Sequence, residues 1–288
     1  MRATAGHIYT VLKLRIGIMI AVCALAGLAV TPGAAPPAWQ IAILGLAVLL
    51  SSASAGAFNH YVERDLDAKM ARTRNRPFVT GRFRPGLPWL WAIGAMLVVS
   101  VGGAALILNI PVALHTFLGA FVYGVVYTVW LKRRTAWNIV WGGLAGSFAV
   151  LAGASAVNPT LAAEPVWLAI VLFLWTPPHF WSLAIALHED YKAAGVPMLP
   201  VVVGDEKAAW IILAHTLAVV AASVVPAFYG LGWIYLTAAL AGGIWFTHRS
   251  IQLVQAPSRK TAMANFFASL IQLGLLLTAA MLDPWILG

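Results

Sequence analysis

The sequence predicts an all-α membrane protein, a polytopic bundle of nine transmembrane helices. Of the 288 residues, 61% are hydrophobic and only 9% are charged, whereas a soluble globular domain carries about 25% charged residues. All 18 Lys and Arg residues lie before or at the edge of the first apolar run, or in alternate connections between later runs. That asymmetry is expected when one side of a bundle faces the cytoplasm. Lipid is therefore the expected solvent for most of the chain.

Nine apolar runs follow one another, and each approaches the length of about 20 residues that crosses a bilayer as a helix. Taken in order, the first run ends at TPGAAPPAW and the second at a charged segment. The third and fourth are separated by NIP, the fifth and sixth by VNPTLAAEP, and the seventh and eighth by YGLG. The remaining connections carry the basic residues. The predicted spans are Leu14–Val30, Gln40–Phe58, Pro88–Leu108, Pro111–Leu131, Trp137–Val157, Pro165–Leu187, Ala208–Tyr229, Leu231–Phe246 and Asn265–Leu282.

The first run resembles a signal peptide in length, but further apolar spans follow it instead of a cleavage site and a soluble region. It is therefore predicted to be the first membrane helix. A single intramembrane domain is expected over residues 1–288, with the amino terminus and the charged loops in the cytoplasm. Cys23 is the single cysteine, which excludes an intrachain disulfide. The net charge of +9 is attributed to the cytoplasmic loops, so no nucleic-acid partner is expected.

Charged residues crowd into NHYVERDLDAKMARTRNRP, residues 59–77, directly after the second span. If that helix continues past Phe58, then Asn59, Glu63 and Asp67 recur at every fourth position and share one helix face. Their oxygens are the ligand type that Mg²⁺ prefers. Asp65 points away from this face. The alternative is a solvated loop in which acids and bases merely pair with each other.

Arg72 and Arg76 repeat the four-residue step, and guanidinium groups bind phosphate through paired hydrogen bonds. Tyr123 and Tyr127 share a face just before the next basic segment. They are expected either to line the same pocket or to pack between helices.

A second acidic cluster lies in WTPPHFWSLAIALHEDYKAAGVPMLP, residues 175–200. Glu189 and Asp190 end the sixth span and Lys192 follows, while His179 lies about three turns before Asp190 on nearly the same face. Two acidic clusters on one side of the membrane suit metal ions held around a diphosphate, which metal binding turns into a leaving group. The residues thus predict metal-assisted chemistry on a phosphorylated, lipid-soluble substrate. An ion-coupled transporter is the alternative from another class, although the acids lie only at helix ends.

The motifs resemble those of a known family. NxxxExxxD at residues 59–67, followed by RTRNRP at 72–77, is similar to the first acidic motif of the UbiA superfamily of intramembrane prenyltransferases. That superfamily usually has Asp where His60 and Glu63 stand here. These departures resemble one branch, the protoheme IX farnesyltransferases, as do YTVWLKRRTAWNIVWGG (127–143), WTPPHFW (175–181) and DYKAAGVPMLP (190–200).

The resemblance implies transfer of the farnesyl group of farnesyl diphosphate to a vinyl group of haem B, with addition of water, giving haem O and diphosphate. A sister prenyltransferase acting on a quinone-ring or chlorin acceptor is the alternative. A plasma (inner) membrane location is expected, and the family role is compatible with a downstream haem-modifying enzyme as a partner.

The resemblance also assigns roles to single residues. Asn59, Glu63, Asp67 and Asp190 would bind Mg²⁺, with Glu189 beside them. Superfamily members have Asp where His179 and Ala186 stand, so the number of metal ions stays open. The residues expected to bind the diphosphate are Arg72, Arg76, Lys132, Arg133 and Lys192, and those expected to bind haem are His179, Trp175 and Trp181. His179 would ligate the iron or hydrogen-bond a propionate; the alternative is a histidine hydrogen-bonded to a neighbouring helix.

Overall fold

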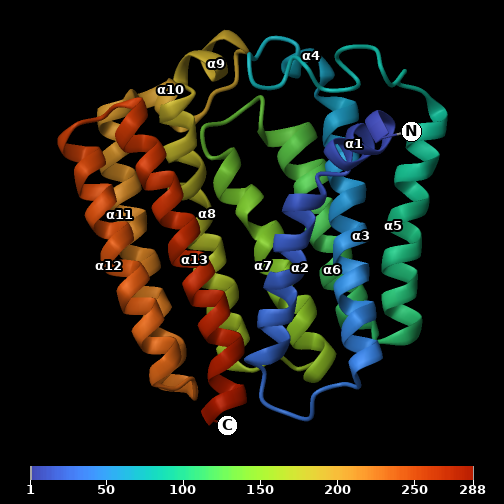
Figure 1. Ribbon diagram of the computed structural model, residues 1–288, viewed down its shortest axis with the longest axis vertical. Coiled ribbons are helices and arrows are strands. Elements are labelled where there is room, and N and C mark those ends of the chain that lie inside the picture. The colour runs from blue at the N-terminus through green and yellow to red at the C-terminus, as the bar shows by residue number, and fades with distance from the viewer. Residues whose placement is uncertain (1, 288) are drawn as a thin grey trace.

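The structure is a computed structural model that describes residues 2–287, and every regular element within them is a helix (Figure 1). The long helices run side by side, and the short helices lie across one end. The elements are α1 (Arg2–Val11), α2 (Leu14–Ala29), α3 (Ala38–Val62), α4 (Arg64–Asp67), α5 (Leu87–Ile107), α6 (Ile110–Phe121), the π-helix η1 (Val122–Leu131), α7 (Asn138–Val157), α8 (Ala163–Ala186), α9 (His188–Ala193), α10 (Leu199–Val203), α11 (Asp205–Val224), the 3₁₀ turn η2 (Val225–Tyr229), α12 (Trp233–Gln255) and α13 (Arg259–Leu287).

The all-α prediction is confirmed, and each predicted span has a helical counterpart. The boundaries differ most for α12, which continues to Gln255 although its apolar run was predicted to end at Phe246. Of the described helices, seven are long and apolar enough to cross a membrane, or up to eight if the bent pair α1–α2 forms one span. The chain is thus an integral multi-pass membrane protein. The count of nine spans and the cytoplasmic amino terminus stay predictions.

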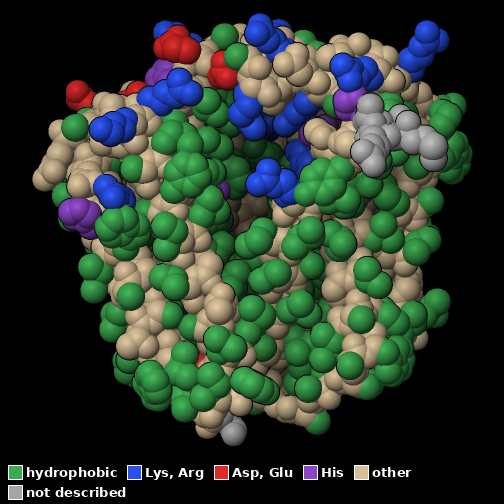
Figure 2. Space-filling view, in the orientation of Figure 1, with side chains coloured by type: hydrophobic (Ala, Val, Ile, Leu, Met, Phe, Trp, Pro, Cys, Tyr) green, Lys and Arg blue, Asp and Glu red, His purple; other side chains and the backbone are tan. Residues whose placement is uncertain are grey.

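The charged segments gather at one end of the bundle. Figure 1 shows α1, α4, α9 and α10 at this end, and both acidic loops therefore share it. Figure 2 shows Lys and Arg side chains concentrated there, above flanks covered by hydrophobic side chains. The same view shows a hollow near the middle of this face, rimmed above by Lys and Arg and bordered below by apolar groups. A charged cap therefore closes an apolar bundle.

The helices α2 and α7 are in backbone contact through two glycines. A Cβ added to Gly153 of α7 would lie 1.7 Å from the main-chain oxygen of Ala24, and one added to Gly27 of α2 would lie 2.1 Å from that of Val150. Small residues permit such close approach between membrane helices. This contact fixes α2 in the bundle and thereby fixes the segment that leads into it from α1.

Candidate functional site

The first acidic motif lies where α3 gives way to α4. The helix ends at Val62, and Glu63 separates it from the short α4. The main-chain N–H of Glu63 still donates to the oxygen of Asn59 at 2.9 Å, and that of Asp67 donates to the oxygen of Glu63 at 2.8 Å. The four-residue step therefore survives the interruption. The second helix does continue past Phe58, as far as Val62, and the face that Asn59, Glu63 and Asp67 were expected to share is present.

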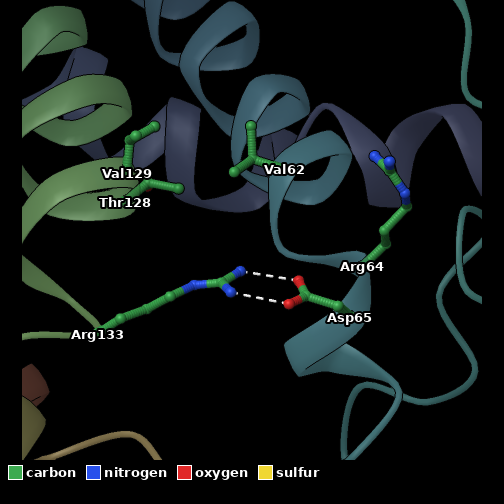
Figure 3. Close-up of a pocket in the computed structure, with 6 residues that line it drawn as sticks. All are labelled: Val62, Arg64, Asp65, Thr128, Val129 and Arg133. Carbon is green, nitrogen blue, oxygen red and sulfur yellow. Dashed lines mark hydrogen bonds and ion pairs between the residues drawn. The ribbon is translucent and has the colours of Figure 1, made fainter.

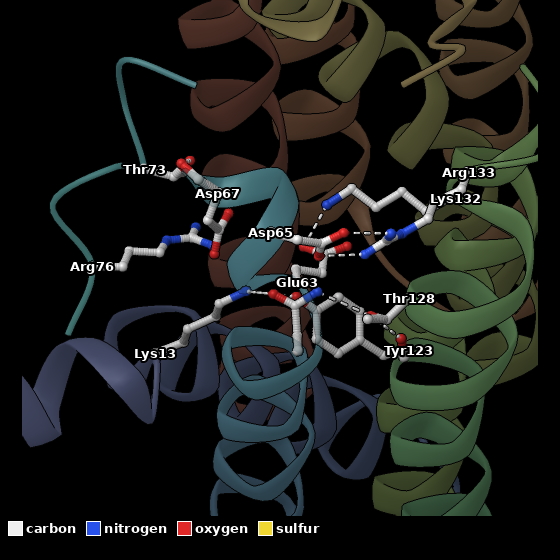
Figure 4. A network of polar contacts seen from close by, with 11 residues as sticks. Lys13, Glu63, Asp65, Asp67, Thr73, Arg76, Tyr123, Thr128, Lys132 and Arg133 are labelled. Carbon is white, nitrogen blue, oxygen red and sulfur yellow. Dashed lines mark hydrogen bonds and ion pairs between the residues drawn. The ribbon is translucent and has the colours of Figure 1, made fainter. Parts of the chain in front are cut away.

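These three side chains are buried, with exposed fractions of 2% for Asn59, 1% for Glu63 and 3% for Asp67. A basic side chain contacts each of them (Figure 4). The pairing of acidic with basic side chains agrees with the alternative of a solvated, self-paired loop. The burial of these side chains, however, contradicts a solvated loop. Each pair is separated by 2.6 Å, and the pairs are Lys13 with Asn59, Lys132 with Glu63, and Arg76 with Asp67.

The π-helix η1 supplies the opposite wall of this site. Its last hydrogen bond runs from the N–H of Lys132 to the oxygen of Tyr127 at 2.9 Å, one residue wider than in an α-helix. Within it, the Thr128 hydroxyl donates to the oxygen of Tyr123 at 2.8 Å and accepts from the amide of Asn59 at 3.0 Å. The rings of Tyr123 and Tyr127 stack with centroids 5.7 Å apart. Helices of this type are rare, and those that occur are often found at functional sites. In this protein the π-helix directs Lys132 toward Glu63.

Asp65 and Arg133 form a separate, outward-facing pair. The guanidinium of Arg133 donates two hydrogen bonds of 2.8 Å to the Asp65 carboxylate, whose side chain is 57% exposed (Figure 3). These bonds hold the pKa of Asp65 below its usual value. The pair lines a shallow pocket with Val62, Arg64, Thr128 and Val129. Asp65 thus points away from the buried stripe as predicted, and Arg133 is engaged by it.

The second acidic cluster lies on α9, beside the first loop. Glu189 is exposed and Asp190 is partly buried, and both line a pocket with Ala71 and Arg259. Lys192 is exposed to solvent. Among the described residues, no three Asp, Glu, His or Cys side chains come together as a metal site. Asp190 thus stands apart from Glu63 and Asp67 in this structure, and its role as a metal ligand stays a prediction.

The two loops meet through Tyr191 instead. Its side chain is buried in one apolar cluster with Leu66 and Met70 of the first loop. Burial raises the pKa of Tyr191, and Arg72 beside it opposes the rise. Tyr191 was missed from the sequence, although it directly follows Asp190. Lys13 and Thr128 were also missed as site residues, because no spacing pattern connects them to the acidic motif.

His179 lies inside α8 in an aromatic slot. Its ring stacks on Trp175 at 4.2 Å and on Phe266 of α13 at 4.4 Å, measured between ring centroids. Its Nδ1 is hydrogen-bonded to the Ser269 hydroxyl at 2.7 Å, while Nε2 makes no hydrogen bond to a described residue. Trp181 stacks with neither ring of this slot. It is fully buried and packs edge-on against Trp137 and His215.

The residues of the first motif fit a divalent cation. The Oε1 atom of Glu63 is buried and has no hydrogen-bond partner within the described chain. With Asp67 and the Asn59 amide, it offers the hard oxygen donors that Mg²⁺ takes. Proteins usually hold Mg²⁺ through one or two carboxylates and leave further positions to water and substrate phosphates. Two carboxylates therefore suffice here, provided that the substrate carries phosphate.

Comparisons with known proteins agree with this chemistry. Residues 20–271 match the UbiA prenyltransferase family. A relative in Paramagnetospirillum magneticum, named protoheme IX farnesyltransferase 2, is 60% identical over 288 residues, which is 100% of both chains. A second from that organism, named protoheme IX farnesyltransferase 1, is 48% identical over 94% of this chain and 96% of its own.

Solved structures show the same fold at low sequence identity. A structure of digeranylgeranylglyceryl phosphate synthase superposes with a TM-score of 0.80 at 17% identity, covering 97% of this chain and 98% of the other. A UbiA homologue from Archaeoglobus fulgidus bound to GPP and Mg²⁺ gives a TM-score of 0.74 at 18% identity, over 96% and 99% of the two chains.

Proposed function

This chain belongs to the UbiA prenyltransferase family, and on that basis we propose that it farnesylates protoheme IX. It transfers the farnesyl group of farnesyl diphosphate to a vinyl group of haem B, water adds, and haem O and diphosphate leave. The observation that carries the proposal is the full-length likeness to a relative of that name. The protein lies in the plasma (inner) membrane, and the concentration of Lys and Arg at one end supports placing this end in the cytoplasm. A downstream haem-modifying enzyme is the expected consumer of the product.

The diphosphate binds at the buried first motif. Asn59, Glu63 and Asp67 hold Mg²⁺, a role supported by the unpartnered Glu63 Oε1 and by the Mg²⁺-bound UbiA homologue. When bound, the ion neutralises the diphosphate and makes it a leaving group. Asp190 and Glu189 approach the same diphosphate from the second loop, a role supported by their pocket, which Ala71 of the first loop also lines.

Basic residues surround the motif and receive the phosphate oxygens. Arg76 and Lys132 already face its carboxylates, and Arg72 lies beside Tyr191 at the junction of the loops. Arg133 and Lys192 are more exposed and act at the outer rim. The burial of the site excludes water, so each charge acts there more strongly than it would in solution.

Haem binds at the aromatic slot of α8. The Ser269 hydroxyl occupies Nδ1 of His179 and leaves Nε2 free to bind iron, and neutral imidazole is a common metal ligand. Trp175 and Phe266 hold the ring in one plane, so its direction is fixed before haem arrives. Trp181 supports this haem site indirectly, through its packing in the neighbouring core cluster.

Replacing His179 with Ala is expected to remove this ligand. The absorption spectrum of bound ferric haem B should change, and the kcat/KM for haem should fall about 10- to 100-fold, the usual effect of losing a supporting metal contact. Affinity for farnesyl diphosphate should be unaffected. His115→Ala is the matched control, because the ring of His115 on α6 is hydrogen-bonded to Ser155 on α7 and does not belong to the aromatic slot of α8. An unchanged haem spectrum in the His179 variant would show that this histidine does not bind iron.

The function itself is tested by incubating the purified protein with haem B, farnesyl diphosphate and Mg²⁺. Mass spectrometry of the extracted pigment should show the added mass of a farnesyl group plus a hydroxyl group, and chelation of Mg²⁺ should abolish the product. Parallel reactions contain a quinone-ring precursor or a chlorin. Prenylation of one of these, with haem B left intact, would identify a sister prenyltransferase instead.

A further inference from the structure

Lys13, which joins α1 to α2, has a strained backbone. Its φ of 50° and ψ of 40° lie in the left-handed region, which is strained for a residue other than glycine. The two helices it joins are bent by 51° relative to each other. Residues kept in such conformations cluster at functional sites, where the surrounding structure maintains them.

The path of the Lys13 side chain is kept open by a glycine. A Cβ added to Gly56 of α3 would lie 3.2 Å from Cβ and 3.4 Å from Cδ of Lys13. Any larger residue at position 56 would press on the stem of the lysine. The α3 helix therefore accommodates this lysine one turn before the acidic motif begins.

The ammonium group ends among neutral oxygens. It donates to Oδ1 of Asn59 at 2.6 Å and to the hydroxyl of Tyr123 at 2.8 Å. It forms no ion pair with a carboxylate anywhere in residues 2–287, and its third N–H has no acceptor among them. Lys13 is partly buried, and a cation that is partly removed from water favours an anionic partner. The missing partner is therefore expected to be a ligand.

The position of Lys13 indicates which part of the ligand it meets. Asn59 is the motif residue deepest in the bundle, one turn below Glu63 and two turns below Asp67. Figure 4 shows Lys13 reaching the stripe on the side opposite to Lys132 and Arg133. A prenyl diphosphate keeps its apolar chain in the bilayer and its phosphates at the charged end. The oxygen that links carbon 1 to phosphorus is then its deepest oxygen.

We propose that Lys13 binds this linking oxygen of the prenyl diphosphate and stabilises it as the bond to carbon breaks. The inference rests on the proposed function. When the C1–O bond breaks, its electron pair stays on the diphosphate, and the prenyl cation takes an electron pair from the acceptor double bond. Water then adds to the acceptor cation and releases one proton to solvent. Lys13 keeps its proton throughout, and its hydrogen bond strengthens as negative charge develops on the oxygen.

The test pairs a change in Lys13 with a change in the oxygen it contacts. Farnesyl thiolodiphosphate carries sulfur at the linking position, and sulfur is a weak hydrogen-bond acceptor. The wild-type protein should therefore turn over the oxygen substrate faster than the sulfur analogue. In Lys13→Met this rate ratio should fall about 10-fold or more, because the variant lacks the donor that distinguishes the two atoms. The control Lys69→Met removes an exposed lysine from the same charged end and should keep the wild-type ratio.

Binding and stability separate this role from a structural one. Affinity for inorganic pyrophosphate with Mg²⁺, measured by calorimetry, should weaken about 10-fold in Lys13→Met. The Tm without ligand should be unchanged or higher, because an apolar replacement of an unpaired cation is often neutral or stabilising. Lys13→Gln provides a second neutral variant should the methionine variant not fold. A lower Tm together with an unchanged oxygen-to-sulfur ratio and unchanged pyrophosphate affinity would overturn the proposal.

The pyrophosphate measurement involves no acceptor. A wild-type protein that binds Mg²⁺-pyrophosphate through Lys13 but leaves haem B unmodified would refute the proposed function and not this inference. A protein that farnesylates haem B with the same oxygen-to-sulfur ratio in both lysine variants would refute the inference alone.

Discussion

Replacing Asp67 with Asn should nearly abolish farnesyl transfer while leaving the protein folded. The substitution keeps the size of the side chain and removes the charge that faces both Arg76, at 2.6 Å, and the expected Mg²⁺. Removing one preorganised electrostatic contact typically lowers kcat by about 100- to 1000-fold. The loss should appear in kcat, because the contact acts on charge that develops as the diphosphate leaves.

Asp65→Asn provides the matched control, two residues away in the same short helix. Asp65 is exposed and paired only with the outer Arg133, and such exposed pairs contribute about 1 kcal/mol or less. Its turnover should stay within a few-fold of wild type. Turnover of both variants is measured with haem B and farnesyl diphosphate over a range of Mg²⁺ concentrations. Full activity of the Asp67 variant would refute the metal assignment.

Replacing Gly153 with Ala should produce the largest loss of stability. The new Cβ would lie 1.7 Å from the main-chain oxygen of Ala24, and no side-chain rotation relieves a contact with backbone. The helices α2 and α7 must move apart and lose their close packing, at a cost of about 3 kcal/mol. The apparent Tm in detergent should fall by about 5 to 10 °C. Activity should fall as well, because α2 begins directly after Lys13.

Gly45→Ala is the control for the general effect of replacing a helical glycine. A Cβ at Gly45 of α3 meets nothing within 4 Å, and alanine favours a helix over glycine by about 1 kcal/mol. This variant should match or exceed the wild-type Tm. If both glycine variants had the same Tm, the backbone contact between α2 and α7 would not be a determinant of stability.

The acidic stripe could be predicted from sequence because its geometry is local. A step of four residues places side chains on one helix face whatever surrounds the helix. The stripe of Asn59, Glu63 and Asp67 survived even the break at Glu63, since the main-chain bonds kept their register. The helical architecture was likewise predictable, because hydropathy depends on composition more than on packing.

The partners of the stripe could not be predicted, because tertiary packing determines them. Lys13 precedes Asn59 by 46 positions, and no periodicity links two residues so far apart. Trp181 shows that proximity in sequence is no better guide to contacts. It lies two positions from His179, yet it packs on Trp137 and His215, because alternate positions of a helix face different neighbours.

The π-helix η1 has a consequence for how this chain can vary. A helix rotates by about 100° per residue, so one residue gained or lost between Phe121 and Lys132 would swing the ammonium of Lys132 off Glu63. Side-chain exchanges along much of this stretch leave that direction intact. Insertions and deletions do not. Natural variants of the protein should therefore preserve the length of residues 122–131 more strictly than their identity.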